Sequence, residues 1–187
     1  MTQALQDQNK IHIRLHSMSQ EQLHTTLEDH HIKLNPYARQ LMDSPYFVLP
    51  KEAKTYTVTL VTLSDLGLTQ GANLPQIFER AQAIGYDLCP LVLAPYMRLE
   101  LLDQVEGEID QSESAIHQTP KQNQAPAGSI TIASPIPSNQ DDFPKGFYLR
   151  KINGDLWLRG YRASLDFIWD PEDTFAFCLP SKKSLVK

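Results

Sequence analysis

Residues 146–162 read GFYLRKINGDLWLRGYR, and the dipeptide Asn153-Gly154 separates two runs that alternate in polarity. A type I′ turn needs positive φ at both central positions, and Asn-Gly is a strong signal for it. The segment therefore predicts a β-hairpin with Ile152 opposite Asp155. In this register the other pairs are Lys151 with Leu156, Arg150 with Trp157, Leu149 with Leu158, Tyr148 with Arg159, Phe147 with Gly160 and Gly146 with Tyr161.

The predicted register sorts the side chains of the hairpin onto two faces. One face is apolar and suits a protein core; it carries Phe147, Leu149, Leu156 and Leu158. The other face, called the hairpin face below, combines aromatic rings with guanidinium groups; it carries Tyr148, Arg150, Trp157, Arg159 and Tyr161. These five residues are the candidate binding residues of the chain.

Three interpretations of the hairpin face remain open. Trp, Tyr and Arg are enriched at the energetic centres of protein interfaces, so the face suits a protein partner. Aromatic and arginine side chains also stack on bases, which suits single-stranded nucleic acid. The third interpretation is structural: Arg150 over Trp157 and Arg159 over Tyr148 form cross-strand cation–π pairs, covered by the N-terminal helices.

The composition is that of an ordinary globular protein and narrows the choice of partners. The 187 residues are 41% hydrophobic and 21% charged, with a formal net charge of −5. A net negative charge repels polyanions, which disfavours nucleic acid unless basic residues gather on one face. The sequence has no run of membrane-spanning length and no signal peptide, so we expect a cytoplasmic protein with no membrane partner.

Catalytic and metal-binding motifs are absent from the sequence. It contains no P-loop, G-x-G-x-x-G, H-E-x-x-H or G-x-S-x-G string. The two cysteines, Cys89 and Cys178, lack the spacing of a zinc site and are predicted to be buried free thiols. We therefore expect no cofactor, no metal and no catalytic residue, and the sequence leans against an enzyme.

Two clusters of polar side chains are the basis of an alternative hypothesis, that the chain is a small enzyme. His30 and His31 follow a predicted helix, and Asp170, Glu172 and Asp173 follow Trp169. Either group could bind a metal or move protons. Solvated histidines at a helix end and a turn begun by Asp170-Pro171 explain them without any site.

Periodicity predicts a mixture of strands and helices. Ser19, with Gln22 at the capping-box position, begins one short helix, and Asn35-Pro36 begins another over 37–43. The main helix is predicted over 74–84, ending at Gly85. Apart from a short N-terminal strand over 11–15, the predicted strands are 55–63, 97–102, 129–134, 147–152, 156–162 and 175–179.

We expect an α+β fold with a mostly antiparallel sheet, one main helix packed on it and two short N-terminal helices. The expected organisation is a flexible tail over 1–10, a single domain over 11–180 and a basic tail over 181–187. Within the domain, the segment 104–128 is rich in Glu, Gln and Ser and has no aromatic residue, which predicts a disordered or flexible insertion.

Three segments resemble an uncharacterised family of small bacterial proteins. The resemblance rests on LG-x-x-x-GA at 66–72, LCP at 88–90, RL-x-x-x-DQ at 98–104, the GFYLR-x-I-x-G-x-LWLRGY hairpin and the W-x-P-x-D-x-F-x-F end at 169–177. It covers 55–103 and 129–177. Some members are labelled helicase by automatic transfer, and the missing P-loop contradicts a helicase motor here. The resemblance implies no catalytic residues.

From the residues, the leading hypothesis is a non-catalytic cytosolic module that binds another protein through the hairpin face. A nucleic-acid accessory factor and a small carboxylate/histidine enzyme are the alternatives.

Overall fold

A computed structural model describes residues 10–107 and 125–180 of the chain. In this part the helices are α1 (Gln20–Asp29), α2 (Pro36–Met42), α3 (Leu74–Ala83) and α4 (Leu93–Glu100). The strands are β1 (Lys10–Leu15), β2 (Lys33–Leu34), β3 (Lys54–Thr62), β4 (Ile130–Ile132), β5 (Gly146–Ile152), β6 (Asp155–Tyr161) and β7 (Thr174–Cys178). The tails over 1–9 and 181–187, and residues 108–124 of the predicted insertion, lie outside the described residues.

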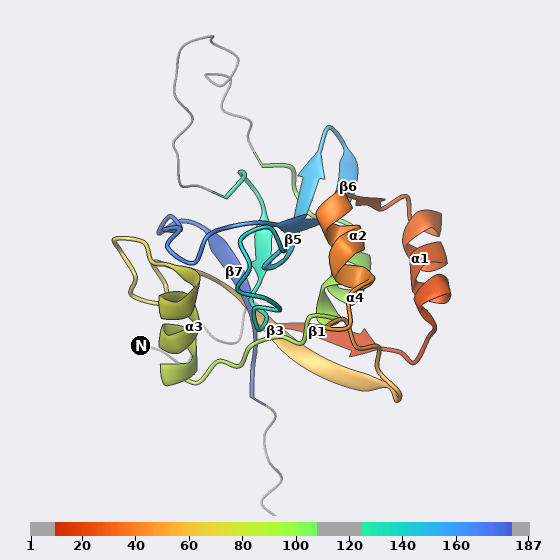
Figure 1. Ribbon diagram of the computed structural model, residues 1–187, viewed down its shortest axis with the longest axis horizontal. Coiled ribbons are helices and arrows are strands. Elements are labelled where there is room, and N and C mark those ends of the chain that lie inside the picture. Colours follow the sequence, from red (N-terminus) through yellow and green to blue (C-terminus); the bar gives the residue numbers. More distant parts are fainter. Residues whose placement is uncertain (1–9, 108–124, 181–187) are drawn as a thin grey trace, which may run out of the picture.

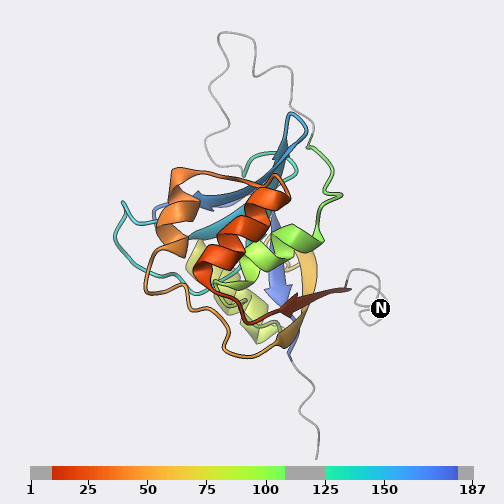
Figure 2. The ribbon, with the colours of Figure 1, turned by 90° about the vertical axis from the view of Figure 1, so that its right-hand side faces the viewer.

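The strands form one sheet with helices on both faces. Its order is β1-β3-β7-β4-β5-β6-β2. Helix α3 lies on one side of the sheet, and α1, α2 and α4 lie on the other (Figure 1). The view turned by 90° shows these three helices together in front of the sheet (Figure 2).

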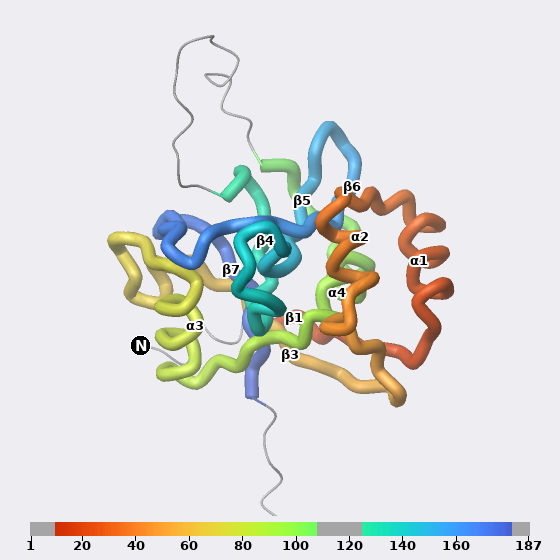
Figure 3. The backbone as a smooth tube through the Cα atoms, in the orientation of Figure 1, coloured from red at the N-terminus to blue at the C-terminus, as the bar shows by residue number. Residues whose placement is uncertain are grey.

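Each face of the sheet has its own hydrophobic cluster. The first contains Phe147, Leu149 and Leu158 of the hairpin together with buried residues of α1, α2 and α4. The second packs α3 against Phe175, Phe177 and Trp169. Residues 84–92 carry the chain from α3 across to α4 (Figure 3). The sheet is thus buried on both faces, whereas a simple antiparallel meander needs a core on only one.

The β5–β6 hairpin has the predicted register, with all seven pairs from Gly146–Tyr161 to Ile152–Asp155 confirmed. Asn153 and Gly154 have φ angles of 50° and 82°, as the turn requires. The predicted caps are also confirmed. Ser19 and Gln22 form a capping box on α1, and Asn35 caps α2.

The predicted fold class is wrong. The sheet is mixed, because β4 runs parallel to β7 and β2 runs parallel to β6. The chain also has a fourth helix in place of the strand predicted over 97–102. Strand order depends on contacts between residues far apart in the sequence, and a parallel pair leaves no local turn signal for it.

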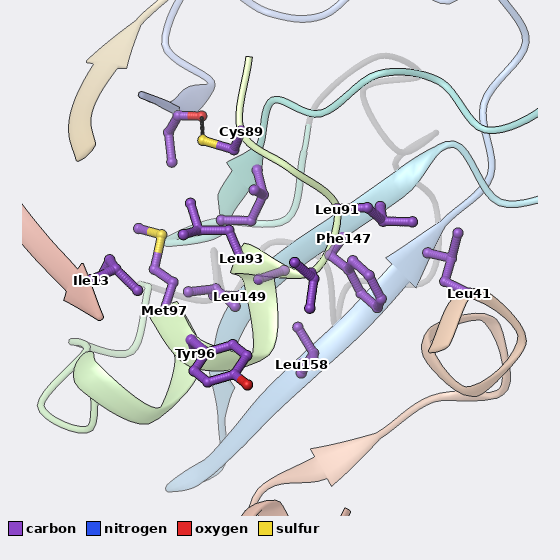
Figure 4. Packing of buried hydrophobic residues seen from close by; sticks show 14 of the residues in the cluster. Ile13, Leu41, Cys89, Leu91, Leu93, Tyr96, Met97, Phe147, Leu149 and Leu158 are labelled. Carbon is purple, nitrogen blue, oxygen red and sulfur yellow. Dashed lines mark hydrogen bonds between the residues drawn. The ribbon is translucent and has the colours of Figure 1, made fainter. Parts of the chain in front are cut away.

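The sequence of α4 predicts a strand because the helix is buried on nearly all sides. Its residues 93–98 are all buried, so no polar stripe marks a helical period. Pro95 falls in the first turn, where a proline is tolerated. Figure 4 shows Leu93 and Met97 of α4 beside Leu149 of β5, deep in the first cluster.

Asn35 joins α2 to the edge of β6. Its Oδ1 accepts hydrogen bonds from the Ala38 N–H at 2.9 Å and the Gly160 N–H at 2.8 Å, and its Nδ2 donates to the Gly160 carbonyl at 2.9 Å. The side chain thus caps the helix and pairs with the strand like a further backbone segment. Gly160 is required at this contact, because a Cβ there would lie 2.6 Å from the Tyr37 carbonyl carbon.

No helix in the described ranges 10–107 and 125–180 is long and apolar enough to cross a bilayer.

We expect Asn35→Ala to lower the free energy of unfolding by about 3 kcal/mol, measured by urea denaturation. The loss of a helix cap costs about 1 kcal/mol, and a buried amide and carbonyl left without partners add about 1–3 kcal/mol. Asn73→Ala is the matched control, since Asn73 caps α3 through the same kind of capping contact and its capping hydrogen bond is open to solvent. Equal losses in the two variants would show that the bond to Gly160 contributes nothing.

Candidate binding site on the hairpin face

Three of the five predicted residues form a stack of alternating aromatic and cationic groups. The Arg159 guanidinium carbon lies 5.0 Å from the centre of the Trp157 ring and 5.9 Å from that of Tyr148. Its Nε also donates to the Tyr148 hydroxyl at 2.7 Å. The distances of 5.0 and 5.9 Å from the guanidinium carbon to the two ring centres are within the range of a cation–π interaction. Strand pairing places the three side chains together, since Tyr148 is directly opposite Arg159 and Trp157 is two residues away on the same face.

Lys33 extends this stack from outside the hairpin. Strand β2 sets Lys33 beside Trp157 in parallel register, and the Lys33 ammonium lies 5.8 Å from the Trp157 ring. The same ammonium forms an ion pair with Asp155. We call Lys33, Trp157, Arg159 and Tyr148 the cation–aromatic stack. Sequence reasoning missed Lys33, because nothing local indicates that the two-residue strand β2 adds to β6.

The other two predicted residues lie apart from the stack. Tyr161 packs edge-to-face on Trp169, with ring centres 5.4 Å apart, and it borders the second hydrophobic cluster. Burial raises the pKa of Tyr161, so its phenol is neutral. Arg150 is half-buried, and its Nε is buried with no hydrogen-bond partner in the described part of the chain. The hairpin face therefore changes along its length, from a core-like end at Tyr161 to a charged end near the turn.

The structure differs in two ways from the interpretation in which the hairpin face forms cross-strand cation–π pairs covered by the N-terminal helices. Arg159, rather than Arg150, lies over the Trp157 ring. The N-terminal helices α1 and α2 pack in the cluster of Phe147, Leu149 and Leu158, which is the opposite face of the hairpin. They cannot cover the stack, and all four of its side chains keep some exposure to solvent.

The turn of the hairpin is held by residues at the start of the predicted insertion. The Glu106 carboxylate accepts hydrogen bonds from the backbone N–H groups of Asn153 and Gly154, the latter at 3.1 Å. Two residues earlier, the Gln104 amide donates to the Gly128 carbonyl at 2.8 Å and receives a hydrogen bond from Arg98. Arg98 is fully buried, and burial lowers its pKa to about 10. These bonds tie the tip of the hairpin to the end of α4.

A cavity of about 150 Å³ lies at the core-like end of the hairpin face. Thr131 of β4, Tyr148 of β5 and Tyr161 of β6 contribute to its lining from the sheet, and Trp169 and Phe167 do so from the loop that follows β6. Tyr148 is therefore shared between the cavity and the stack. Sequence reasoning missed Thr131, Phe167 and Trp169, because their meeting depends on how the loop folds back over the sheet.

The predicted carboxylate cluster is a turn. The Asp173 side chain is 8% exposed and accepts hydrogen bonds from the backbone N–H groups of Asp170, at 2.9 Å, and Ala125, at 3.1 Å. Glu172 points elsewhere and accepts a hydrogen bond from the Ser64 hydroxyl at 3.1 Å. Asp173 thus acts as an internal brace that ties residue 125 to the turn before β7.

The structure does not bring the two predicted polar clusters together. His30 and His31 lie exposed at the end of α1, and His30 Nδ1 donates to the Thr26 carbonyl. Helix α1 and the loop before β7 lie on opposite sides of the molecule (Figure 1). No group of three His, Cys, Asp or Glu side chains in residues 10–107 and 125–180 is arranged to hold a metal ion.

The two cysteines are buried free thiols, as predicted. The Cys178 thiol donates to the Cys89 sulfur at 3.3 Å, and the Cys89 thiol faces the Ala176 carbonyl at 3.5 Å. Burial, together with the neighbouring Cys178, raises the pKa of Cys89 well above its ordinary value. A thiol that resists ionisation is a poor nucleophile, so this pair belongs to the core.

Asp173 gives the protein a defined pH dependence. Burial raises its pKa from the usual 3.8 to about 6, so between these values the folded state holds more protons than the unfolded chain. Its contribution to stability is therefore fully present well below pH 4 and falls as pH rises through 6. A difference of one pKa unit corresponds to about 1.4 kcal/mol, and part of the loss falls below pH 4, so we expect wild type to lose about 2 kcal/mol relative to Asp173→Asn between pH 4 and 7. Urea unfolding at several pH values measures this difference.

Glu172→Gln is the control for this series, because Glu172 belongs to the same turn and is exposed. Its stability relative to wild type should change little over the same pH range. Parallel pH profiles for wild type and Asp173→Asn would show that the Asp173 carboxyl titrates normally.

Comparison with known proteins adds no assignment to this site: no family model, curated protein or solved structure matches the chain.

Proposed function

We propose that the chain is a non-catalytic binding protein, and that its cation–aromatic stack holds an acidic, aromatic-containing segment of another protein. The observation that carries this proposal is the position of Trp157. This large aromatic side chain and its neighbour Tyr148 belong to neither hydrophobic cluster of the described residues. Half-buried Trp, Tyr and Arg side chains outside a core are the types that dominate binding at protein interfaces.

The charges on the face support an acidic partner. Lys33, Arg150 and Arg159 surround Trp157, and Asp155 neutralises one of them. Nε is the one group of Arg159 with a hydrogen bond to a described residue, so both amino groups remain free to pair with a carboxylate. The stack is already ordered by its internal contacts, which lowers the entropy lost on binding.

A protein partner fits this chain better than nucleic acid does. The net charge of −5 opposes the approach of a polyanion, whereas a short acidic segment presents few charges at a time. We assign the binding to the cytoplasm, since the two cysteines are free thiols, which a reducing compartment maintains. The resemblance to an uncharacterised bacterial family is consistent with a binding role without catalysis.

The proposal is tested with an array of random dodecapeptides of two compositions, one rich in Glu and Tyr and one with Lys in place of Glu. Wild type should bind the acidic set selectively. The double substitution Trp157→Ala/Arg159→Ala should weaken binding at least tenfold, because truncation of hot-spot residues typically costs 2 kcal/mol or more. Its melting temperature should stay within about 5 °C of wild type, since surface changes cost little stability.

Lys151→Ala is the matched control, because it removes a cation from the opposite face of the same hairpin. It should leave peptide binding unchanged. Three outcomes would overturn the proposal: no selection of acidic peptides, equal binding by the double variant, or a large loss of stability that assigns the stack a purely structural role. Binding of a single-stranded oligonucleotide that falls steeply with salt would instead favour the nucleic-acid alternative.

A further inference from the structure

Strand β1 forms the open edge of the sheet. It is first in the strand order, β3 covers one of its sides, and no described strand pairs with the other. At the opposite edge of the sheet, Asn35 and β2 cover β6. An edge strand of six residues presents a row of backbone N–H and C=O groups with which a further strand can pair.

The register of β1 with β3 shows which of these backbone groups face outward. The Leu179 N–H donates to the Thr57 carbonyl at 2.8 Å, so the backbone groups of Thr57 point toward the end of β7. His12 lies opposite Thr57. Opposite residues of an antiparallel ladder are either bonded to each other or both directed away, so the N–H and C=O of His12 point away from β3. The same holds for Arg14, two residues further along the strand.

The side chains on this edge are basic on one face of the sheet. Lys10, His12 and Arg14 share a face by the alternation of the strand, and all three are exposed. Arg14 forms no ion pair with any residue in the described ranges. Unlike charges on opposite residues of neighbouring strands stabilise a sheet, and like charges destabilise it. We therefore expect a strand that pairs with β1 to place carboxylates opposite these side chains.

The residues of β1 on the other face are apolar. Ile13 and Leu15 are buried in the first hydrophobic cluster, and Ile11 is partly buried against it. A strand added beside them continues this face and places every second side chain at the margin of the cluster. At the end of β1 the Tyr96 hydroxyl donates to the His16 carbonyl at 2.6 Å, which fixes the strand on α4. The matching partner alternates acidic and apolar residues.

A second copy of the chain fits this edge poorly. In an antiparallel pair, residues whose backbone groups face the partner strand stand opposite one another. Two copies of β1 would therefore set His12 and Arg14 against the same basic residues of the other copy, and like charges in these positions oppose pairing. The basic side chains thus protect the edge from pairing with itself and leave it open to an acidic strand.

We propose that β1 is a docking edge for an extended segment of another protein in which acidic and apolar residues alternate. The segment adds to the sheet as an eighth strand beside the seven present, with affinity from backbone hydrogen bonds and selectivity from the alternating side chains. This site lies at the opposite edge of the sheet from the cation–aromatic stack, so it is independent of the function proposed above (Figure 1). Sequence reasoning identified residues 11–15 as a short strand and attached no function to them.

The test uses a capped octapeptide of alternating Glu and Val, which lacks the aromatic residues expected in a ligand of the stack, and a Lys/Val peptide as its control. The readout is hydrogen exchange of backbone amides, followed residue by residue in ¹H–¹⁵N spectra. Saturating Glu/Val peptide should slow the exchange of the His12 and Arg14 amides at least about tenfold, because each gains a hydrogen bond, and Lys/Val peptide should not. The Ile13 amide already bonds to β3 and should change little.

Two N-methylated forms of the Glu/Val peptide separate strand addition from simple charge attraction. N-methylation of every Glu removes one alternating row of backbone N–H groups, and N-methylation of every Val removes the other. One row faces β1 and the other faces solvent, so one form should lose binding and the other should keep it. Equal behaviour of the two forms would show that no strand is added.

His12→Pro and His12→Ala are matched variants that lose the same side chain. Proline also removes the outward N–H and is tolerated on an edge strand where that group faces solvent. His12→Pro should therefore abolish peptide binding, and His12→Ala should retain it. Arg14→Glu should weaken Glu/Val binding about tenfold, the factor expected when an attractive cross-strand pair becomes a repulsive one. The N-methylated peptides keep the test valid if His12→Pro fails to fold.

The two proposals fail independently. Trp157→Ala/Arg159→Ala should leave Glu/Val binding unchanged, and His12→Pro should leave the binding of Glu- and Tyr-rich peptides to the stack unchanged. The docking edge is disproved if the His12 and Arg14 amides exchange as fast with the Glu/Val peptide as without it, or if His12→Ala loses binding as fully as His12→Pro. A dimer in sedimentation velocity that His12→Pro dissociates would assign the edge to a second copy instead.

Discussion

Asn153 and Gly154 adopt φ angles of 50° and 82° at the tip of the hairpin, and this turn permits only one pairing of β5 with β6. A slip of one residue would exchange the two faces of a strand, moving Trp157 and Arg159 into the cluster built around Phe147 and Leu149. Burial of the Arg159 guanidinium there without a partner would be strongly unfavourable. The register therefore determines both the core on one face and the site on the other.

The rest of the sheet is assembled around this hairpin by contacts that span long stretches of chain. Strand β4 has three residues, yet it joins the halves of the sheet by pairing with β5 on one edge and β7 on the other. On the far side of the hairpin, Asn35 and β2 cover the edge of β6. An edge strand closed in this way is protected from pairing with other chains.

The surroundings of the hairpin face change along its length, from Tyr161 toward the turn. At Tyr161 and Trp169 the face is continuous with the α3 cluster and lines a small cavity that is open to solvent on one side. Toward the turn, beyond that cluster, the same face carries Arg159, Trp157 and Lys33 in a half-exposed stack. One sheet surface thus offers a small aromatic cavity and an amphipathic surface side by side, and Tyr148 connects them.

Local sequence determined the features that depend on neighbouring residues: the hairpin register from Asn153-Gly154, the helix starts from Ser19 and Asn35, and the burial of both thiols. The tertiary structure alone decided the mixed strand order, the helical state of 93–100 and the meeting of Trp169 with Tyr161. Helix α4 is buried on nearly every side, so its hydrophobic pattern carries no period. Lys33 and Trp169 join the site through a parallel pairing and a loop closure, and contacts over such distances leave no pattern in the sequence near either residue.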